Sequence, residues 1–464
     1  MKSTELNYLP INELSRLIAS GQMSPVEVTR AALDRIDALR DFDNAFTEVF
    51  EETALEAART ADSEIADSRY RGALHGVPVA LKDLCDVEGT VTTAGAKALG
   101  DRPAESDCEL AVRLRAAGAV IIGKTNLHEF AYGGTGVNPH FGTPPNPWRM
   151  DRIPGGSSSG SAVAVATGMA PAAIGSDTGG SIRLPAAHCG ITGLKPTFGR
   201  VSRRGVFPLS MTLDNVGPMT RSALDCALML EAIAGYDPGD RYSVDRPSER
   251  FSAGIDIGIS GRRIGVPSNY FFEDLEPEAH ASITRALGVL SDLGAVLVDI
   301  EIPWAEEAFE INIAGVEAAW VHRDRLADPD VRARIGEDTV SRLEIGNQFS
   351  AGEFHGFLNR RQEIAALAAA LMEEVDLIAT PSAPGVAGRI EGVQTLAYRP
   401  NLKFTGVFNQ TWQPSLSIPC GFGAEGLPLG LMLTGAWWNE RLVLRAGHAF
   451  QQATDWHTAR PPVD

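Results

Sequence analysis

The feature that most restricts the fold is a repeated change from helical to strand periodicity across a glycine. Residues 106–126, SDCELAVRLRAAGAVIIGKTN, begin with a capping box, keep helical spacing to Gly118, and continue as an apolar strand over 119–122. The same order returns in residues 283–303, where a helix ends at Gly294 and a strand follows. Helices that alternate with buried strands are typical of α/β proteins. We therefore expect one large α/β domain with a central, mixed, twisted β-sheet covered by helices on both faces.

Other segments fit the same plan. Further strand candidates lie at residues 75–83, 376–380, 415–419 and 427–433. A C-terminal helix is expected at residues 440–454. The first seventy residues have a helical pattern, because Ser24-Pro25-Val26-Glu27 combines an N-cap serine, a proline at the first helical position and a capping-box glutamate. We predict a helical N-terminal extension over residues 1–70, packed on a main domain of residues 71–464, with the helix-rich region 325–375 as a cap over the sheet.

Composition excludes several classes of protein. The balance of 41 basic against 59 acidic residues gives a net charge of −18, which argues against direct nucleic-acid binding over a broad face. The start of the sequence has no apolar signal-peptide core and no apolar run is long enough to span a bilayer, so we expect a cytoplasmic protein without membrane contact. The five cysteines lack C-x-x-C spacing and the nine histidines lack ligand-pair spacing, so we expect reduced thiols, no metal and no cofactor.

Two short motifs match nucleotide-binding and hydrolase patterns, but the residues around each motif do not fit the structure that the motif requires. GAVIIGKT at 118–125 satisfies the Walker A pattern, yet Ala-Val-Ile-Ile favours a strand and cannot curl around a phosphate. Gly156-Ser157-Ser158-Ser159-Gly160 matches the nucleophile elbow G-x-S-x-G, which needs an apolar strand in front of it. The preceding residues, NPWRMDRIP, are rich in proline and charge, so we reject both interpretations.

A longer constellation is far more specific. It joins GVPVALKD at 76–83, IPGGSSSGSAVAVATG at 153–168 and AAIGSDTGGSIRLPAAHCGITGLKPTFGRVS at 172–202. These segments resemble the amidase signature family, and so do residues 123–148, 217–240 and 441–457, so the resemblance covers nearly the whole chain. The resemblance implies the amidase signature fold.

The resemblance also implies a Ser–cis-Ser–Lys triad. Lys82 matches the base, Ser157 the bridging serine whose preceding peptide bond is cis, and Ser181 the nucleophile. A serine hydroxyl needs a base within hydrogen-bond reach, and lysine can be that base only when it is neutral. The position of Lys82 directly after an apolar run makes burial of its amine reasonable. Ser158 is expected to serve the start of a helix instead.

The remaining site residues follow from the same resemblance. Backbone N–H groups of the glycine-rich loop are expected to form the oxyanion hole, and a second segment matches the family's acyl pocket. The predicted oxyanion-hole residues are Thr178, Gly179 and Gly180. The predicted acyl-pocket residues are Ala131, Tyr132 and Gly133. Asp177 and Arg183 should support the loop, and the neighbours His188 and Cys189 should be structural.

These residues predict an amidohydrolase that cleaves a carboxylic amide of a small molecule through a Ser181 acyl-enzyme. One alternative is the glutamine-hydrolysing A subunit of a tRNA-dependent amidotransferase, which TGLKPTFGRVSRRGVFPLS resembles. That subunit should carry an acidic group for the ammonium of glutamine in the stretch at 398–414, which has none, and Trp412 replaces a family glycine there, which favours an apolar or aromatic amide. Arg361 is expected to face solvent. Carbamates, ureas and esters stay open as substrates. The sequence also leaves open whether the protein forms a homodimer.

Overall fold

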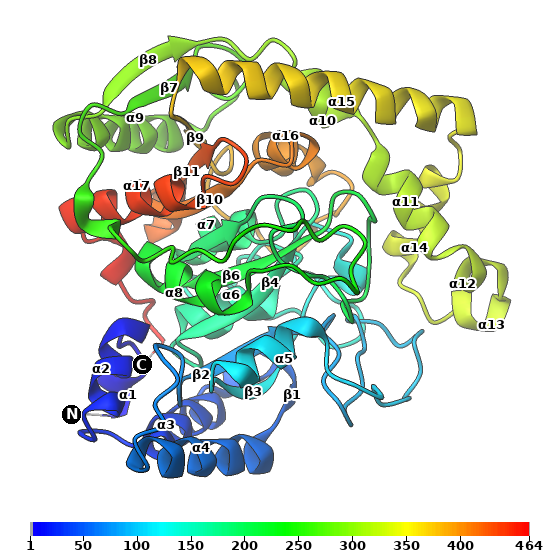
Figure 1. Ribbon diagram of the computed structural model, residues 1–464. Helices are drawn as coiled ribbons and strands as arrows, with labels where there is room; N and C mark the ends of the chain where they lie inside the picture. The colour runs from blue at the N-terminus through cyan, green and yellow to red at the C-terminus, as the bar shows by residue number, and fades with distance from the viewer. Residues whose placement is uncertain (1–2, 464) are drawn as a thin grey trace.

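Eleven strands pair into one mixed sheet that runs through the whole molecule (Figure 1). The computed structural model describes residues 3–463. The strand order is β1-β3-β2-β4-β6-β5-β10-β11-β9-β7-β8. The bounds are β1 Phe46–Val49, β2 Pro78–Lys82, β3 Val120–Thr125, β4 Ala172–Asp177, β5 Thr192–Lys195, β6 Asn215–Thr220, β7 Arg263–Pro267, β8 Val296–Ile300, β9 Leu377–Pro381, β10 Ser415–Phe422 and β11 Pro428–Gly435. Strand β2 pairs in parallel with β3 and β4, whereas the central pairs from β4 to β9 are antiparallel.

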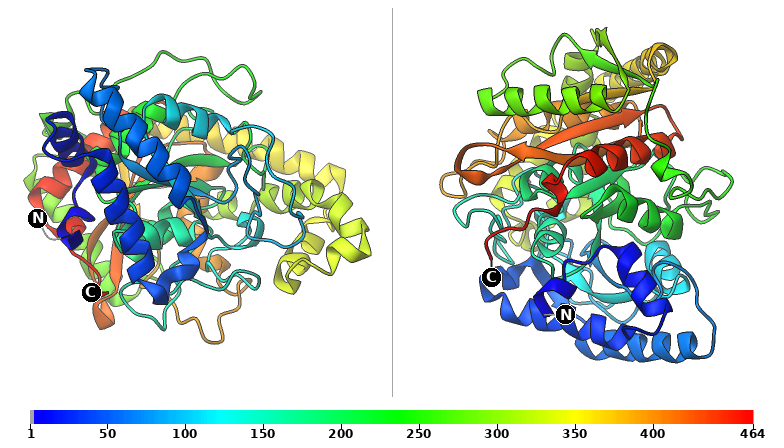
Figure 2. Two further views of the ribbon diagram at one scale, coloured as in Figure 1. Left: turned by 90° about the horizontal axis from the view of Figure 1, so that it is seen from below. Right: turned by 90° about the vertical axis from the view of Figure 1, so that its left-hand side faces the viewer.

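Helices cover both faces of this sheet, which confirms the predicted fold class (Figures 1 and 2). The side chains of β2 show why, because successive residues of a strand point to opposite faces. Val79 and Leu81 join a core with α5, α8 and α17, whereas Ala80 joins a core with α3, α4 and α6. The helices are α1 Ser3–Leu6, α2 Ile11–Ala19, α3 Pro25–Ala38, α4 Glu51–Ala66, α5 Glu109–Ala116, α6 Ser159–Ala166, α7 Arg183–Cys189, α8 Ala223–Ile233, α9 Pro277–Asp292, α10 Ala305–Glu310, α11 Ile313–Val321, α12 Arg323–Ala327, α13 Pro329–Arg332, α14 Glu337–Gly346, α15 Ala351–Glu374, α16 Lys403–Gln410 and α17 Glu440–Ala453.

Elements with a clear periodicity lie where the sequence predicts them. Both halves of the predicted capping box at the start of α3 are present, with Ser24 Oγ accepting from Glu27 N–H at 3.1 Å and Glu27 accepting from Ser24 N–H at 2.8 Å. The Walker-like segment forms β3, and Lys124 Nζ donates at 2.8 Å to Val91 O, so the segment is a buried strand and not a phosphate loop.

The sequence patterns did not predict β1, β7 or the central strands β4, β5 and β6. Strand β1 has only four residues, and the other strands contain glycine or proline, which are depleted from strands in general. Strand β1 adds an edge to the sheet from within the segment predicted as a helical extension, by pairing with β3. The division of the chain at residue 70 stays a prediction.

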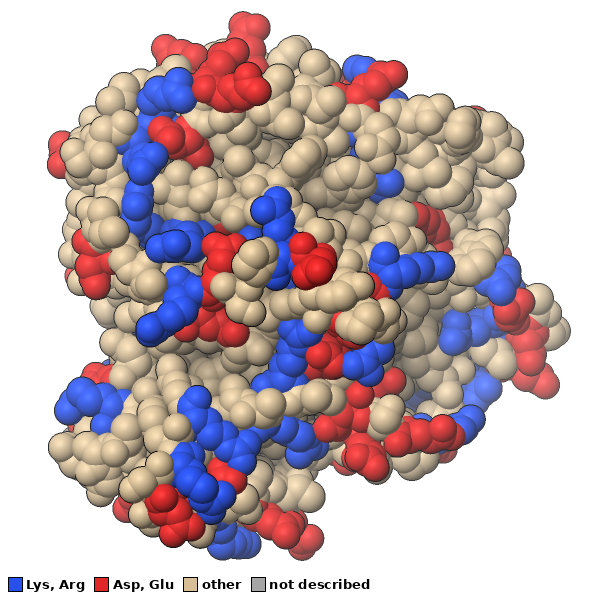
Figure 3. Space-filling model, in the orientation of Figure 1, with Lys and Arg blue, Asp and Glu red and all other residues tan. Residues whose placement is uncertain are grey.

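The helix-rich region predicted at 325–375 corresponds to α12–α15, and α11–α14 project to one side of the sheet (Figures 1 and 2). On the face shown in Figure 3, basic and acidic side chains are interspersed. No helix in the described part of the chain has the length and apolar character needed to cross a membrane.

Close packing of α6 against the neighbouring loops gives a prediction about stability. A Cβ on Gly160 would lie 2.2 Å from Ala45 O and 2.6 Å from Asn126 N, both backbone atoms. We expect Gly160→Ala to lower the free energy of unfolding by about 1–3 kcal/mol, because the backbone must shift to make room. Urea unfolding followed by circular dichroism measures the change.

The matched control is Gly288→Ala in α9, where an added Cβ meets no atom within 4 Å. This substitution should raise the free energy of unfolding by about 0.5–1 kcal/mol, because alanine favours an exposed helix more than glycine does. Equal effects of the two substitutions would contradict the packing described for α6.

Candidate active site

The amine of Lys82 lies at the end of β2, surrounded by three serine hydroxyls. Its Nζ is 2.7 Å from Ser157 Oγ, 3.0 Å from Ser158 Oγ and 2.7 Å from Ser176 Oγ. Ser157 and Ser158 precede α6, and Ser176 belongs to β4, which pairs in parallel with β2 and so brings its end beside Lys82. The predicted base and bridging serine are therefore in direct contact, and Ser176 joins them although no sequence pattern marked it.

Burial sets the charge of this lysine. Lys82 is 1% exposed, and burial lowers its pKa to about 7, against the opposing influence of the Asp177 and Asp214 carboxylates. A neutral amine has two N–H donors and one lone pair, so one of the three serines must donate to it. Ser158 Oγ already donates to Ser176 O at 3.2 Å. The lone pair is thus left to Ser157 or Ser176.

The loop before α6 is held by backbone hydrogen bonds to the segments of His128 and Ser181. The peptide bond between Gly156 and Ser157 is cis, as the family resemblance implies. The carbonyl of Ser157 accepts from His128 N–H at 3.0 Å, and Ser158 N–H donates to Ser181 O at 3.2 Å. Ser158, predicted to be structural, thus contacts both the lysine and the backbone of Ser181.

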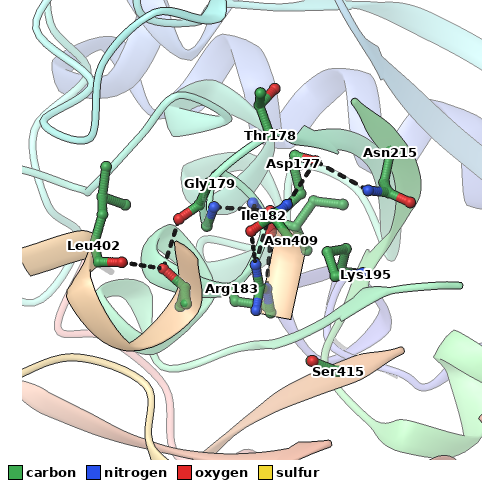
Figure 4. Close-up of polar contacts among 12 residues, drawn as sticks. Asp177, Thr178, Gly179, Ile182, Arg183, Lys195, Asn215, Leu402, Asn409 and Ser415 are labelled. Atoms are coloured by element: carbon green, nitrogen blue, oxygen red, sulfur yellow. Dashed lines mark hydrogen bonds and ion pairs between the residues drawn. The ribbon is translucent and has the colours of Figure 1, made fainter. Parts of the chain in front are cut away.

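Asp177 holds the glycine-rich loop that carries Ser181 (Figure 4). Its carboxylate accepts from Gly180 N–H at 2.8 Å, Ile182 N–H at 3.1 Å and Arg183 Nε at 3.0 Å. Asn409 of α16 donates to the same carboxylate at 2.9 Å. Burial would raise the pKa of Asp177, but these partners, led by Arg183, lower it to about 2. The predicted supporting role of Asp177 and Arg183 therefore has a definite geometry, a buried ion pair that fixes the loop.

Two of the three predicted oxyanion residues, Thr178 and Gly179, line a cavity of about 450 Å³ together with Ser181. The N–H of Gly180 is engaged by Asp177, as described above. Ala131, Tyr132 and Gly133 of the predicted acyl pocket line the same cavity. The oxyanion and acyl-pocket roles of these residues stay predictions, but all of them except Gly180 line one cavity with the predicted nucleophile.

Sequence reasoning missed two arginines that line this cavity. Arg342 of α14 lies over the ring of Tyr132 at 4.6 Å, and Arg399 pairs with Glu310 at 3.7 Å. Both come from helical segments far from the serine motifs in sequence, and nothing in their local pattern distinguishes them from surface arginines.

The expectation that Arg361 faces solvent is wrong. This side chain is buried on the inner side of α15, where it donates to Thr212 Oγ1 at 2.6 Å and stacks on Trp412 at 4.8 Å. Trp412 in turn donates to Thr212 O at 3.1 Å, and neither Trp412 nor Arg361 is among the described residues that line the cavity. Trp412 therefore gives no structural support to the predicted preference for an aromatic amide.

His188 and Cys189 are buried in α7, and burial lowers the pKa of His188 to about 4 and raises the pKa of Cys189. The described residues, 3–463, contain no group of three or more His, Cys, Asp or Glu side chains that could hold a metal ion.

A mixed sheet that buries a lysine among three serines, with a glycine-rich loop that lines a cavity, is the arrangement expected of the amidase signature hydrolases. The family model described as Amidase matches residues 27–444, and the chain belongs to this family. The resemblance found in the sequence is thereby confirmed.

Individual relatives match over almost the full length. A protein of Geobacter metallireducens, named as the A subunit of glutamyl-tRNA(Gln) amidotransferase, is 40% identical, over 99% of this chain and 100% of its own. The protein of the same name from Chloroflexus aggregans is 39% identical over 99% of both chains. A solved structure described as an unexpected vestigial protein complex that reveals the evolutionary origins of an s-triazine catabolic enzyme is 34% identical, with a TM-score of 0.91 over 98% of this chain and 100% of that one.

The buried ion pair under the glycine-rich loop predicts a large stability effect. We expect Asp177→Asn to lower the free energy of unfolding by about 3–5 kcal/mol, because it leaves the Arg183 guanidinium buried without a compensating charge. The control Asp67→Asn removes an exposed partner of Arg69 at 3.1 Å and should change it by no more than about 0.5 kcal/mol. Chemical denaturation measures both, and similar values for the two variants would contradict the role given to Asp177.

Proposed function

We propose that this protein hydrolyses a carboxylic amide through an acyl-enzyme on Ser181, with Ser157 as proton relay and Lys82 as base. The observation that carries the proposal is the buried Lys82 amine, 2.7 Å from Ser157 Oγ and with a pKa of about 7. A base with a pKa near neutrality is deprotonated often enough to accept a proton and acidic enough to return it.

The steps balance in protons. Ser181 Oγ attacks the amide carbonyl while its proton passes to Ser157, whose own proton moves to the lone pair of Lys82. Backbone N–H groups of the Thr178–Gly179 segment face the oxygen that becomes negative. When the C–N bond breaks, the proton returns through Ser157 to the departing amine or ammonia. A water molecule then repeats the sequence on the ester and releases the carboxylic acid.

The charges around the cavity favour an acyl group with a negative substituent. Two arginines line it, Arg342 and Arg399, and Arg342 also pairs with Asp338 at 2.9 Å. Glu310 is the one carboxylate among the described residues of the lining, and it pairs with Arg399. A planar guanidinium matches the geometry of a carboxylate. We therefore propose an anionic amide as substrate.

A second candidate is glutamine hydrolysis as the A subunit of an amidotransferase. The names of the most similar relatives favour it over a stand-alone amidase. Glutamine carries an ammonium group as well as a carboxylate, so the cavity must supply an acid, and Glu310 is the candidate. Carbamates, ureas and esters could undergo the same acylation, so they belong in the same assay.

The experiment is a hydrolysis screen with the purified full chain. Glutamine, glutaramate (the same skeleton without the amine), neutral amides, carbamates and esters are compared, with glutamine also tested in the presence of partner subunits of an amidotransferase. Turnover of glutaramate without partners supports an independent amidase, and glutamine turnover that Glu310→Gln abolishes supports the second candidate. Hydrolysis that persists in Ser181→Ala would contradict both.

The pKa of Lys82 predicts the pH profile. The neutral amine is the active form, so kcat/KM should rise about tenfold per pH unit below an apparent pKa of about 7 and level off above it. Initial rates between pH 5 and 9 measure the profile, with circular dichroism confirming that the protein stays folded. A rate that is independent of pH or falls toward alkaline pH would exclude Lys82 as the base.

The serine-rich stretch offers a matched pair of variants. Ser157→Ala removes the relay and should lower kcat by about 10²–10⁴-fold. Ser161 in the same stretch bonds Ile174 O at 2.9 Å and has no described contact with Lys82, so Ser161→Ala should stay within a few-fold of the unmodified enzyme. Equal losses in the two variants would assign Ser157 a structural role.

A further inference from the structure

His128 joins the cavity arginine to the serine relay. Its Nε2 lies 3.0 Å from Arg342 Nη2, and its Nδ1 lies 3.3 Å from Thr135 Oγ1. Its backbone N–H donates to Ser157 O at 3.0 Å. One residue thus contacts both the group proposed to bind the substrate and the group proposed to move its proton.

The hydrogen-bond inventory fixes the state of this imidazole. A guanidinium only donates, so Nε2 must accept from Arg342, and the ring proton sits on Nδ1, where it donates to Thr135 Oγ1. Burial, followed by the charges of Arg342 and Lys82, keeps the pKa of His128 well below its usual range. The ring therefore stays neutral and offers Arg342 a fixed acceptor.

The cavity wall is shaped to hold this ring. A Cβ on Gly133 would lie 2.4–2.6 Å from three ring atoms of His128, so a larger residue there would displace the imidazole. This contact gives Gly133 a physical reason to be small. The ring thus packs directly behind the backbone of the proposed acyl pocket.

Arg342 is held on several sides and keeps spare donor capacity. Asp338 accepts from its Nη2 at 2.9 Å, the guanidinium lies over Tyr132, and Arg342 is buried at 8% exposure. Its Nε has no hydrogen-bond partner within residues 3–463. A buried donor without a partner is costly, and an anionic ligand would satisfy it.

Helix α14, which carries Arg342, has a separate anchor on the same loop. Glu129 accepts from Gly336 N–H, the residue before α14, at 3.0 Å, and from His140 Nε2 at 2.7 Å. Because Glu129 holds the start of the helix, His128 is not needed to keep α14 in place. Its contact acts on the guanidinium itself.

We propose that His128 is a positioning residue that orients the Arg342 guanidinium to receive the anionic group of the substrate, and so determines the preference for anionic over neutral amides. This inference rests on the proposed function for its substrate class. It goes further by assigning the selectivity to a neutral histidine outside the triad, whose backbone also holds the relay serine.

The test measures binding and turnover separately. Dissociation constants of glutaramate and of hexanamide, its neutral analogue of similar length, are measured by calorimetry on Ser181→Ala protein with and without His128→Leu. We expect the ratio of the two affinities to fall at least about tenfold with His128→Leu, because the guanidinium loses its fixed acceptor. His128→Gln, which keeps an acceptor oxygen, should restore most of the ratio.

A buried histidine elsewhere provides the control. His322 packs against Phe130 and Phe207 and has no hydrogen-bond partner for its ring within the described chain. The ratio should be unchanged in His322→Leu. An equal effect of His322→Leu, an unchanged ratio in His128→Leu, or no recovery in His128→Gln would overturn the inference. Selective binding of glutaramate without any turnover by the unmodified enzyme would instead contradict the proposed function and leave the inference standing.

Discussion

The contact on which the active site depends is that of the Lys82 amine with three serine hydroxyls in a fully buried position. Burial lowers the pKa of this lysine to about 7 in spite of the nearby carboxylates, and the hydroxyls provide the hydrogen bonds that a buried amine requires. The contact exists because β2 and β4 pair in parallel and end together, while the turn before α6 brings two serines from the other side. The order of the strands, the turn and the start of α6 together place the three hydroxyls around the Lys82 amine.

A second buried charge fixes the loop opposite this amine. The Asp177–Arg183 pair holds the backbone around Ser181, and Asn409 connects it to α16, more than two hundred residues later in the chain. The cavity is then closed by α10, α11 and α14, which carry Glu310 and Arg342, and by the segment of Arg399. The sheet and its loops thus carry the residues proposed for the chemistry, whereas the later helices supply much of the cavity wall.

The sequence predicts these parts unequally, and the reasons are physical. Strands β2, β3, β9, β10 and β11 carry apolar runs and α3 carries its predicted capping box, so local patterns identify them. The capping box predicted before α5 is wrong, because Cys108 caps that helix. Strand β6 contains Gly217 and Pro218, which pair with β4 in the middle of the sheet. From the sequence alone, this glycine-proline pair favours the prediction of a turn. Lys82, Ser157 and Ser181 came from a family resemblance, because no local pattern gives a long-range contact. Ser176, His128 and Arg342 contact neighbours that only the folded chain brings close. The prediction for Arg361 is wrong because its helix has no strong apolar face.

We expect the Lys82 amine to lose its proton near neutrality, and a direct titration tests this expectation. The chain has six lysines, so ¹³Cε-labelled lysine gives few NMR signals. The variants Lys82→Met, Lys124→Gln and Lys195→Gln assign the signals of the three buried lysines among the described residues. We predict that the signal absent from Lys82→Met titrates near pH 7. A Lys82 signal that stays protonated above pH 9 would contradict the account of this site.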